Sequence, residues 1–279
     1  MTEALVAAAL SFVVLVVCFV PLERAFPARA QGILRPAIAT DLLFFLGQYL
    51  VFTTASIALL VELSKVYTRV APDVVARVVS MPLPARLALA VILGDVAVYA
   101  FHRASHRFEL LWRFHSVHHS SEHLDWLAAH REHPVDGVLT QLCQNAPAIL
   151  LAAPLGSIAW LAVLRGMWAV FVHSNVRIPL GPLRWILGSP ELHHYHHALL
   201  EPGAPVRNFA NLAPWLDLVF GTHHLPKEGE RYALGDGLPR AGYASLLVRP
   251  FRPSPVVRAA PTPATSELGA GAAPRRSAA

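Results

Sequence analysis

The chain has 279 residues, of which 54% are hydrophobic and only 15% are charged. Soluble domains usually carry about 25% charged residues, so this composition excludes an ordinary soluble protein and indicates apolar surface in contact with lipid. The formal net charge of +5 does not predict a nucleic-acid partner. Its arginines flank apolar runs or lie near the C-terminus, as is common in membrane proteins.

Three long apolar runs predict membrane-spanning helices at residues 4–20, 42–63 and 83–101. The first is expected to be a retained helix and not a signal peptide, because no basic residue precedes it and no small-x-small cleavage motif follows it. The chain is therefore expected to be an integral membrane protein.

A fourth apolar region, residues 138–172, is too long for one span and too short for two ordinary ones. Pro147, Pro154 and Gly156 interrupt it. These breaks predict a hairpin of two short or tilted helices that turns near residues 153–156. The chain would then leave the membrane on the side where it entered.

The loop charges predict the orientation. Arginines follow the first and third runs, and the positive-inside tendency places both loops in the cytoplasm. These arginines are Arg24, Arg29, Arg35, Arg103, Arg107, Arg113 and Arg131. Lys65, Arg69 and Arg77 then fall on the opposite side, unless residues 66–79 form an amphipathic helix at the membrane surface.

These elements predict an all-α, polytopic membrane protein with about four to five transmembrane or hairpin helices and a cytoplasmic, helical, histidine-rich metal cap. Residues 1–249 are expected to form a single membrane-embedded domain. Residues 250–279 are rich in Pro, Ala and Ser and lack an apolar period, which predicts a disordered tail.

All fifteen histidines lie between His102 and His224. Eight of them form three groups at spacings of three and four residues. On a helix such residues share one face, so each group is expected to present its imidazoles toward one point. Imidazole is a common ligand of divalent transition metals. The groups are His102 and His106; His115, His118 and His119; and His193, His196 and His197.

Eight convergent histidines are about twice the four ligands of a structural zinc site, so the count predicts two metal ions. His173, at the end of the predicted hairpin, is a natural ninth ligand. Nearby carboxylates are expected to contact the ligand imidazoles. The candidates are Asp95, Asp125, Asp136 and Glu191.

The other histidines are interpreted differently. His194 lies between His193 and His197 in the chain but is expected to point away from their shared face. His223 and His224 are interpreted as ordinary surface or core residues. Three more follow the second group but lie off its helical face: His123, His130 and His133. Of these, His133 is a candidate partner of a ligand.

These motifs resemble those of the fatty-acid hydroxylase and sterol desaturase superfamily of membrane di-iron enzymes. The resemblance covers roughly residues 90–225 and rests on HRASH, HSVHH, FVHSN and HHYHH, in that order. It implies nine iron ligands: His102, His106, His115, His118, His119, His173, His193, His196 and His197. It also implies that the motifs face the cytoplasm. Some members carry a further histidine near the position of His173, where this chain has Trp168, Ala169 and Val170.

The resemblance implies a non-haem di-iron monooxygenase or desaturase that uses O2 on a lipid or sterol-like substrate in the membrane. No flavin, haem or Fe–S motif is present, so electrons are expected from a cytochrome b5-like or ferredoxin-type donor. Chain hydroxylation and sterol-ring desaturation both fit the sequence. A membrane metal-binding or transport protein is the alternative of another class. Transporters place polar ligands at mid-membrane, whereas these motifs follow the apolar runs.

Overall fold

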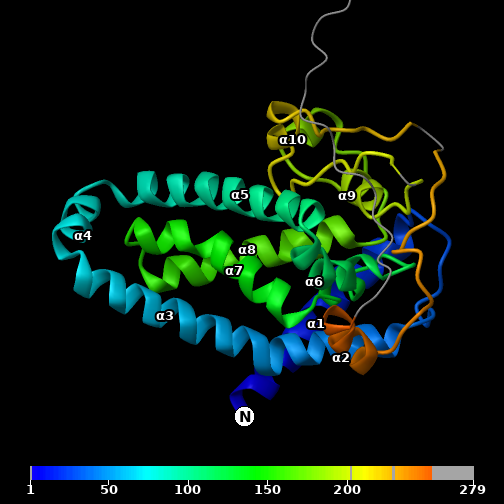
Figure 1. Cartoon of the computed structure of the whole chain (residues 1–279), viewed down its shortest axis with the longest axis horizontal. Helices are drawn as coiled ribbons and strands as arrows, with labels where there is room; N and C mark the ends of the chain where they lie inside the picture. Colours follow the sequence, from blue (N-terminus) through cyan, green and yellow to red (C-terminus); the bar gives the residue numbers. More distant parts are fainter. Residues whose placement is uncertain (1, 202, 228–229, 253–279) are drawn as a thin grey trace, which may run out of the picture.

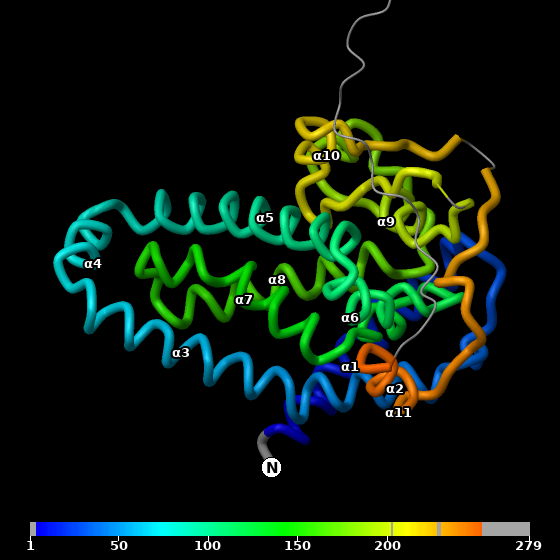
Figure 2. Tube along the Cα trace, in the orientation of Figure 1, coloured from blue at the N-terminus to red at the C-terminus, as the bar shows by residue number. Residues whose placement is uncertain are grey.

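The computed structural model describes residues 2–201, 203–227 and 230–252 (Figures 1 and 2). Over these residues the fold is helical, and extended chain pairs only at isolated bridges. The predicted all-α class is therefore confirmed. The α-helices are α1 (Thr2–Ala25), α2 (Ile38–Gly47), α3 (Thr53–Val70), α4 (Pro72–Val79), α5 (Leu83–Arg107), α6 (Glu109–His119), α7 (Pro134–Leu150), α8 (Leu155–His173), α9 (Pro190–His196), α10 (Trp215–Val219) and α11 (Tyr243–Val248).

Four helical stretches are long and apolar enough to cross a membrane: Ala4–Ala25, Ile38–Val70, Leu83–Arg107 and Leu155–His173. At most 22% of the apolar window in each is buried inside the protein. Large apolar side chains such as Val17 and Trp160 are more than half exposed on these helices. A soluble protein rarely exposes so much contiguous apolar surface, so these faces are suited to lipid.

The second stretch is longer than the predicted run at residues 42–63. α2 and α3 are joined by one π-helical segment, Gln48–Phe52, into a continuous helix. The apolar run suggested that the helix ends near residue 63. Glu62 and Lys65 form an exposed ion pair within α3, so the helix continues past these charged residues. Residues 66–79, which were predicted to form one surface helix, are divided between the end of α3 and α4. The break comes before Pro72, which lacks an N–H group and begins α4.

The predicted hairpin is present as α7 and α8. It turns at residues 151–154, slightly earlier than expected, and Pro147 lies within α7 instead of ending it. Arg86 on α5 stabilises the turn by donating to the carbonyl oxygens of Leu151 and Ala152, at 3.2 and 2.7 Å. α7 and α8 run between α3 and α5, and α8 returns the chain to the end of the bundle where α5 finishes (Figure 1).

A buried charge network ties the segment before α2 to the loop after α6. The Arg35 guanidinium contacts Asp125 at 2.5 Å and Asp41 at 2.7 Å. Arg131 contacts the other oxygen of Asp41 at 2.5 Å. These side chains are at most 9% exposed. The network therefore holds the loop that carries Arg131 against α2.

We expect Asp41→Asn to lower the free energy of unfolding by about 3–5 kcal/mol, because it removes the carboxylate that two buried guanidinium groups share. Unfolding of the purified protein in detergent measures the change. Glu62→Gln is the control, since its ion pair with Lys65 lies at the protein surface and not in the core. Equal stability of the two variants would contradict a structural role for the network.

Candidate metal centre

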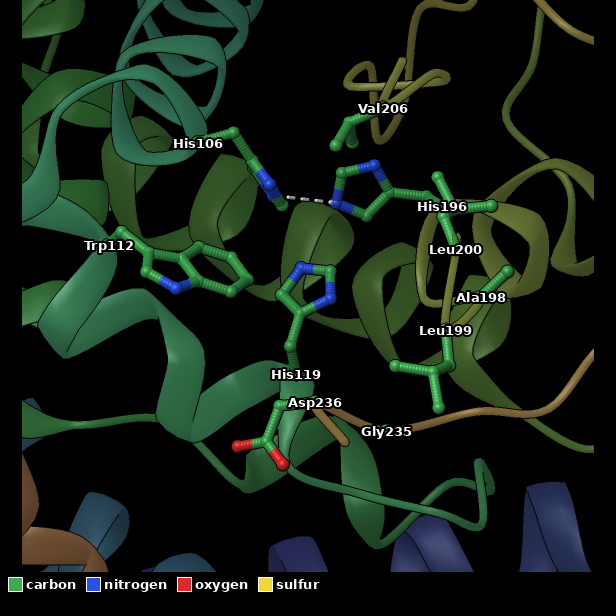
Figure 3. A pocket seen from close by; sticks show the side chains of 10 residues that line it. All are labelled: His106, Trp112, His119, His196, Ala198, Leu199, Leu200, Val206, Gly235 and Asp236. Carbon is green, nitrogen blue, oxygen red and sulfur yellow. Dashed lines mark hydrogen bonds between the residues drawn. The ribbon is translucent and has the colours of Figure 1, made fainter. Parts of the chain in front are cut away.

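The structure brings all nine predicted ligands together in two groups, and the ligand nitrogens within each group lie within 4.8 Å of one another. Figure 3 shows His106, His119 and His196 pointing toward one another in the larger group. The five-histidine site consists of His102, His106, His115, His119 and His196. The four-histidine site consists of His118, His173, His193 and His197.

The expectation that the histidines of each motif converge on one point was wrong for α6 and α9. On α6, His115 and His119 face the five-histidine site, whereas His118 faces the four-histidine site. The histidines of HHYHH also divide. His196 faces the five-histidine site, and His193 faces the four-histidine site. A helix turns about 100° per residue, so positions i+3 and i+4 can face neighbouring centres. The two sites therefore share two elements and lie side by side.

Backbone carbonyl groups orient four of the imidazoles. The Nδ1 atoms of these rings donate to carbonyl oxygens at 2.6–3.1 Å. A carbonyl oxygen only accepts, so each Nδ1 carries the proton and the Nε2 of the neutral ring keeps its lone pair for a metal. The four pairs are His102 with Phe209, His118 with Arg131, His173 with Ala169, and His196 with Arg207.

The Nε2 atoms of His118 and His173 face each other at 3.0 Å. Both rings donate through Nδ1 to carbonyl groups, so neither Nε2 of a neutral ring carries a hydrogen. Two lone pairs this close repel unless a cation lies between them. Two nitrogens bound to one ion at about 2.1 Å lie roughly 3 Å apart, so the spacing fits shared metal ligation.

Protonation does not relieve this repulsion, because burial lowers the imidazole pKa values. Burial and neighbouring imidazoles hold the pKa of His118 well below its ordinary value. The same causes act on His193 and His197. Burial lowers the pKa of His196 to about 3. These four imidazoles are therefore neutral at physiological pH, the form in which imidazole binds metal.

Of the four carboxylates expected beside the ligands, only Asp136 contacts one, at 2.8 Å from Nδ1 of His115. Asp95 instead pairs with Arg165, and Asp125 with Arg35. Glu191 is exposed at the start of α9. The prediction for these three was wrong because arginines take Asp95 and Asp125 and Glu191 stays at the surface, while backbone carbonyl groups supply most of the ligand contacts.

Asp217 is a functional position that sequence reasoning missed. Its carboxylate accepts from the backbone N–H groups of Phe209 and Ala210 at 2.8 and 2.9 Å, and from the Thr222 hydroxyl at 2.7 Å. It thereby positions the Phe209 carbonyl that accepts from His102. Residues 208–222 contain no histidine, so the histidine spacings gave no signal for this position.

The remaining histidines lie outside both groups. His194 points away from them, as predicted, and its Nε2 donates to the carbonyl oxygens of His173 and Ser174 at 3.2 and 3.0 Å. His133 contacts the backbone of Val135 and Leu247 instead of a ligand. His130 bonds to Gln48. His223 stacks on Trp185, and His224 lies against Tyr195.

A small cavity with an open mouth adjoins the five-histidine site (Figure 3). His106, His119 and His196 form one wall. The remainder is mainly apolar, with Asp236 at one edge. The apolar residues are Trp112, Ala198, Leu199, Leu200 and Val206. An apolar group therefore has room to approach this site.

Comparison with known proteins agrees with the site. Residues 87–222 match the model of the fatty acid hydroxylase family. The chain is 30% identical over 171 residues to an ornithine lipid hydroxylase of Rhizobium tropici, covering 61% of this chain and 51% of that protein. It is 31% identical over 134 residues to an alkylglycerol monooxygenase of Danio rerio, covering 48% of this chain and 29% of that one.

A methylsterol monooxygenase of Rattus norvegicus is 27% identical over 134 residues, covering 47% of this chain and 44% of the relative. The chain thus spans about half or less of the length of these relatives. No solved structure gives a significant match. Residues 87–222 therefore match the fatty acid hydroxylase family, and the resemblance expected from the sequence is confirmed.

Metal content separates ligands from neighbours in HHYHH. We expect His193→Ala to lower the bound metal from two ions per chain toward one, because it removes a nitrogen from the four-histidine site. His194→Ala should keep both ions, since that side chain bonds only to backbone carbonyl groups. Elemental analysis of folded, purified protein measures both. Loss of an ion in the second variant but not the first would refute this assignment.

Proposed function

We propose that the nine histidines hold two iron ions and that the protein uses O2 to hydroxylate or desaturate a lipid or sterol-like substrate. The chief support is the close approach of the His118 and His173 Nε2 atoms, which calls for a cation. Two neighbouring nitrogen sites suit iron, for which imidazole is a common ligand. Bound iron would supply the O2-dependent oxidising chemistry.

The cavity beside the five-histidine site favours an enzyme over a structural metal site. A structural zinc is closed by four protein ligands and needs no access. Here Trp112, Leu199 and Val206 offer an apolar surface beside the ligands, which suits a hydrocarbon and excludes water. A transporter is disfavoured because the ligands cluster where α5 and α8 end and not at mid-span.

The substrate class follows from the family and from the surroundings of the site. The relatives are described by name as acting on an ornithine lipid, an alkylglycerol and a methylsterol. The exposed apolar faces of the spans give a membrane lipid direct access to the protein. Hydroxylation and ring desaturation both remain within the proposal. Electrons are expected from a separate cytochrome b5-like or ferredoxin-type protein.

The reaction is tested by comparing the lipids of cells that express the chain with those of control cells, grown under ¹⁸O2. We expect a lipid that gains one labelled oxygen, or a new double bond if the enzyme is a desaturase. His118→Ala and His196→Ala should lower product about 100-fold or more, since each removes a proposed ligand. His223→Ala is the control and should retain activity, because that ring stacks on Trp185. Unchanged lipids in cells with folded, iron-loaded protein would refute the proposal.

We also propose that the histidine end of the bundle faces the cytoplasm. Arg35 and Arg131 do not support this orientation, because both are buried in ion pairs. Arg24 and Arg107 are exposed near this end and still favour it.

Reporter fusions test the orientation. Fusions after Ser121 and after Arg240 should both report the cytoplasm, because the α7–α8 hairpin returns the chain to the same end. A fusion after Ser80, at the end of α4, should report the opposite side. Opposite results for the first two positions would mean that only one of the hairpin helices crosses the membrane.

A further inference from the structure

A second cavity lies between α5, α7, α8 and the segment around α10, whose arrangement Figure 1 shows. Its enclosed part is small and has room for a polar group little larger than a water molecule. It is polar, although two of the surrounding helices are long and apolar enough to span a membrane. Its polar lining consists of Asp95, Tyr99, Gln144, Arg165, Trp168 and Asn211.

Arg165 is the central polar group of this cavity, and its side chain is only 9% exposed. One terminal nitrogen donates to Asp95 and to the Val91 carbonyl, each at 2.6 Å. The other approaches the Gln144 carbonyl at 3.4 Å. These contacts explain how the guanidinium is held between three helices. They leave its Nε–H group buried and without a partner among the described residues.

Two further lining residues also have buried polar atoms that lack a hydrogen-bond partner among the described residues. The indole Nε1–H of Trp168 and the side-chain oxygen of Asn211 have no hydrogen-bond partner in the described part of the chain. The indole nitrogen also lies close to the backbone of residue 211, since a Cβ added at Gly188 would meet both. Buried polar atoms are rarely left unpaired because each costs free energy. Two donors and one acceptor without partners therefore belong to side chains that line one cavity.

The charges restrict what can satisfy these atoms. Asp95 and Arg165 neutralise each other, so an added anion would lie near the Asp95 carboxylate and the Asn211 oxygen. An added cation would lie near the guanidinium. Burying an unpaired charge is unfavourable. A neutral group that both accepts and donates hydrogen bonds, such as a hydroxyl or a secondary amide, matches all three atoms.

The cavity lies close to the five-histidine site. Asp95 precedes His102 by seven residues on α5, which is about 10 Å along a helix. One apolar cluster lies between the two cavities: Tyr99, Ala210 and Leu216 line the polar cavity, and Val206 lines the cavity beside the metal site. Only the side chains of this one cluster therefore separate a group held in the polar cavity from the cavity beside the five histidines.

We propose that the polar cavity binds a neutral hydroxyl or amide group of the lipid substrate and thereby selects which carbon reaches the metal site. This rests on the proposed function for its reaction, but the binding itself does not depend on turnover. Arg165 and Trp168 donate to the group, and Asn211 accepts from it. The number of bonds between this polar group and a given carbon of the lipid then determines which carbon is oxidised.

Binding without turnover tests the proposal on the full-length, metal-loaded protein under argon in detergent. Four probes with the same twelve-carbon chain are compared: 1-dodecanol, N-methyldodecanamide, methyl dodecyl ether and dodecanoate. The alcohol and the amide should bind more tightly than the ether, which accepts but cannot donate. Which of those two binds better distinguishes a hydroxyl from an amide. Tighter binding of dodecanoate than of either would overturn the neutral-group assignment.

Two variants locate the binding. Trp168→Phe removes one donor but keeps an aromatic ring, and should weaken binding of the alcohol and amide about 3- to 10-fold. Asn211→Leu should abolish the preference for the alcohol over the ether. The matched control is Trp160→Phe, because that indole lies on the same helix and is 69% exposed. Metal content and thermal unfolding verify that each variant is folded.

If all four probes bind alike, or if Trp168→Phe changes nothing, the cavity holds only water and the proposal fails. A different result refutes the proposed reaction. It is refuted if the wild-type protein discriminates among the probes but carries out no O2-dependent oxidation. The two failures are therefore distinguishable.

Discussion

The structure depends on holding nine imidazoles close together, in surroundings where rings such as His193 and His197 stay neutral. Burial favours neutrality, because a charged ring loses its hydration and is repelled by its neighbours. Orientation comes chiefly from backbone carbonyl groups that accept from Nδ1, such as those of Arg131 and Phe209. A site made this way can bind metal only where those carbonyl groups are held in place.

Much of the surrounding structure holds them. The ion pairs between Arg35, Asp41 and Arg131 fix the loop after α6 against α2. Asp217 gathers the backbone N–H groups of residues 209 and 210, and so positions the carbonyl that orients His102. Neither carboxylate contacts an imidazole. Buried charge therefore supports the histidine cluster indirectly, by fixing the loops that carry these carbonyl groups.

The membrane setting explains the position of the site. Long apolar helices can bury few polar groups, so the histidines cluster where α5 and α8 end and where shorter helices begin. The Asp95–Arg165 pair is one exception, since it lies within two of the spans and lines a polar cavity. Ionisable groups inside spans are costly and are usually kept for a function. Recognition of a substrate group would account for this pair.

The sequence by itself determined the helical class, the hairpin and the identity of all nine clustered histidines, because apolar run length and spacings of three and four residues are local properties. It did not determine how HSVHH and HHYHH divide between two sites, since neighbouring positions on a helix can face different partners. Nor did it identify Asp217, or predict that arginines would take Asp95 and Asp125 from the metal centre. Those contacts join residues far apart in the chain or backbone atoms common to every residue, so only the tertiary structure decided them.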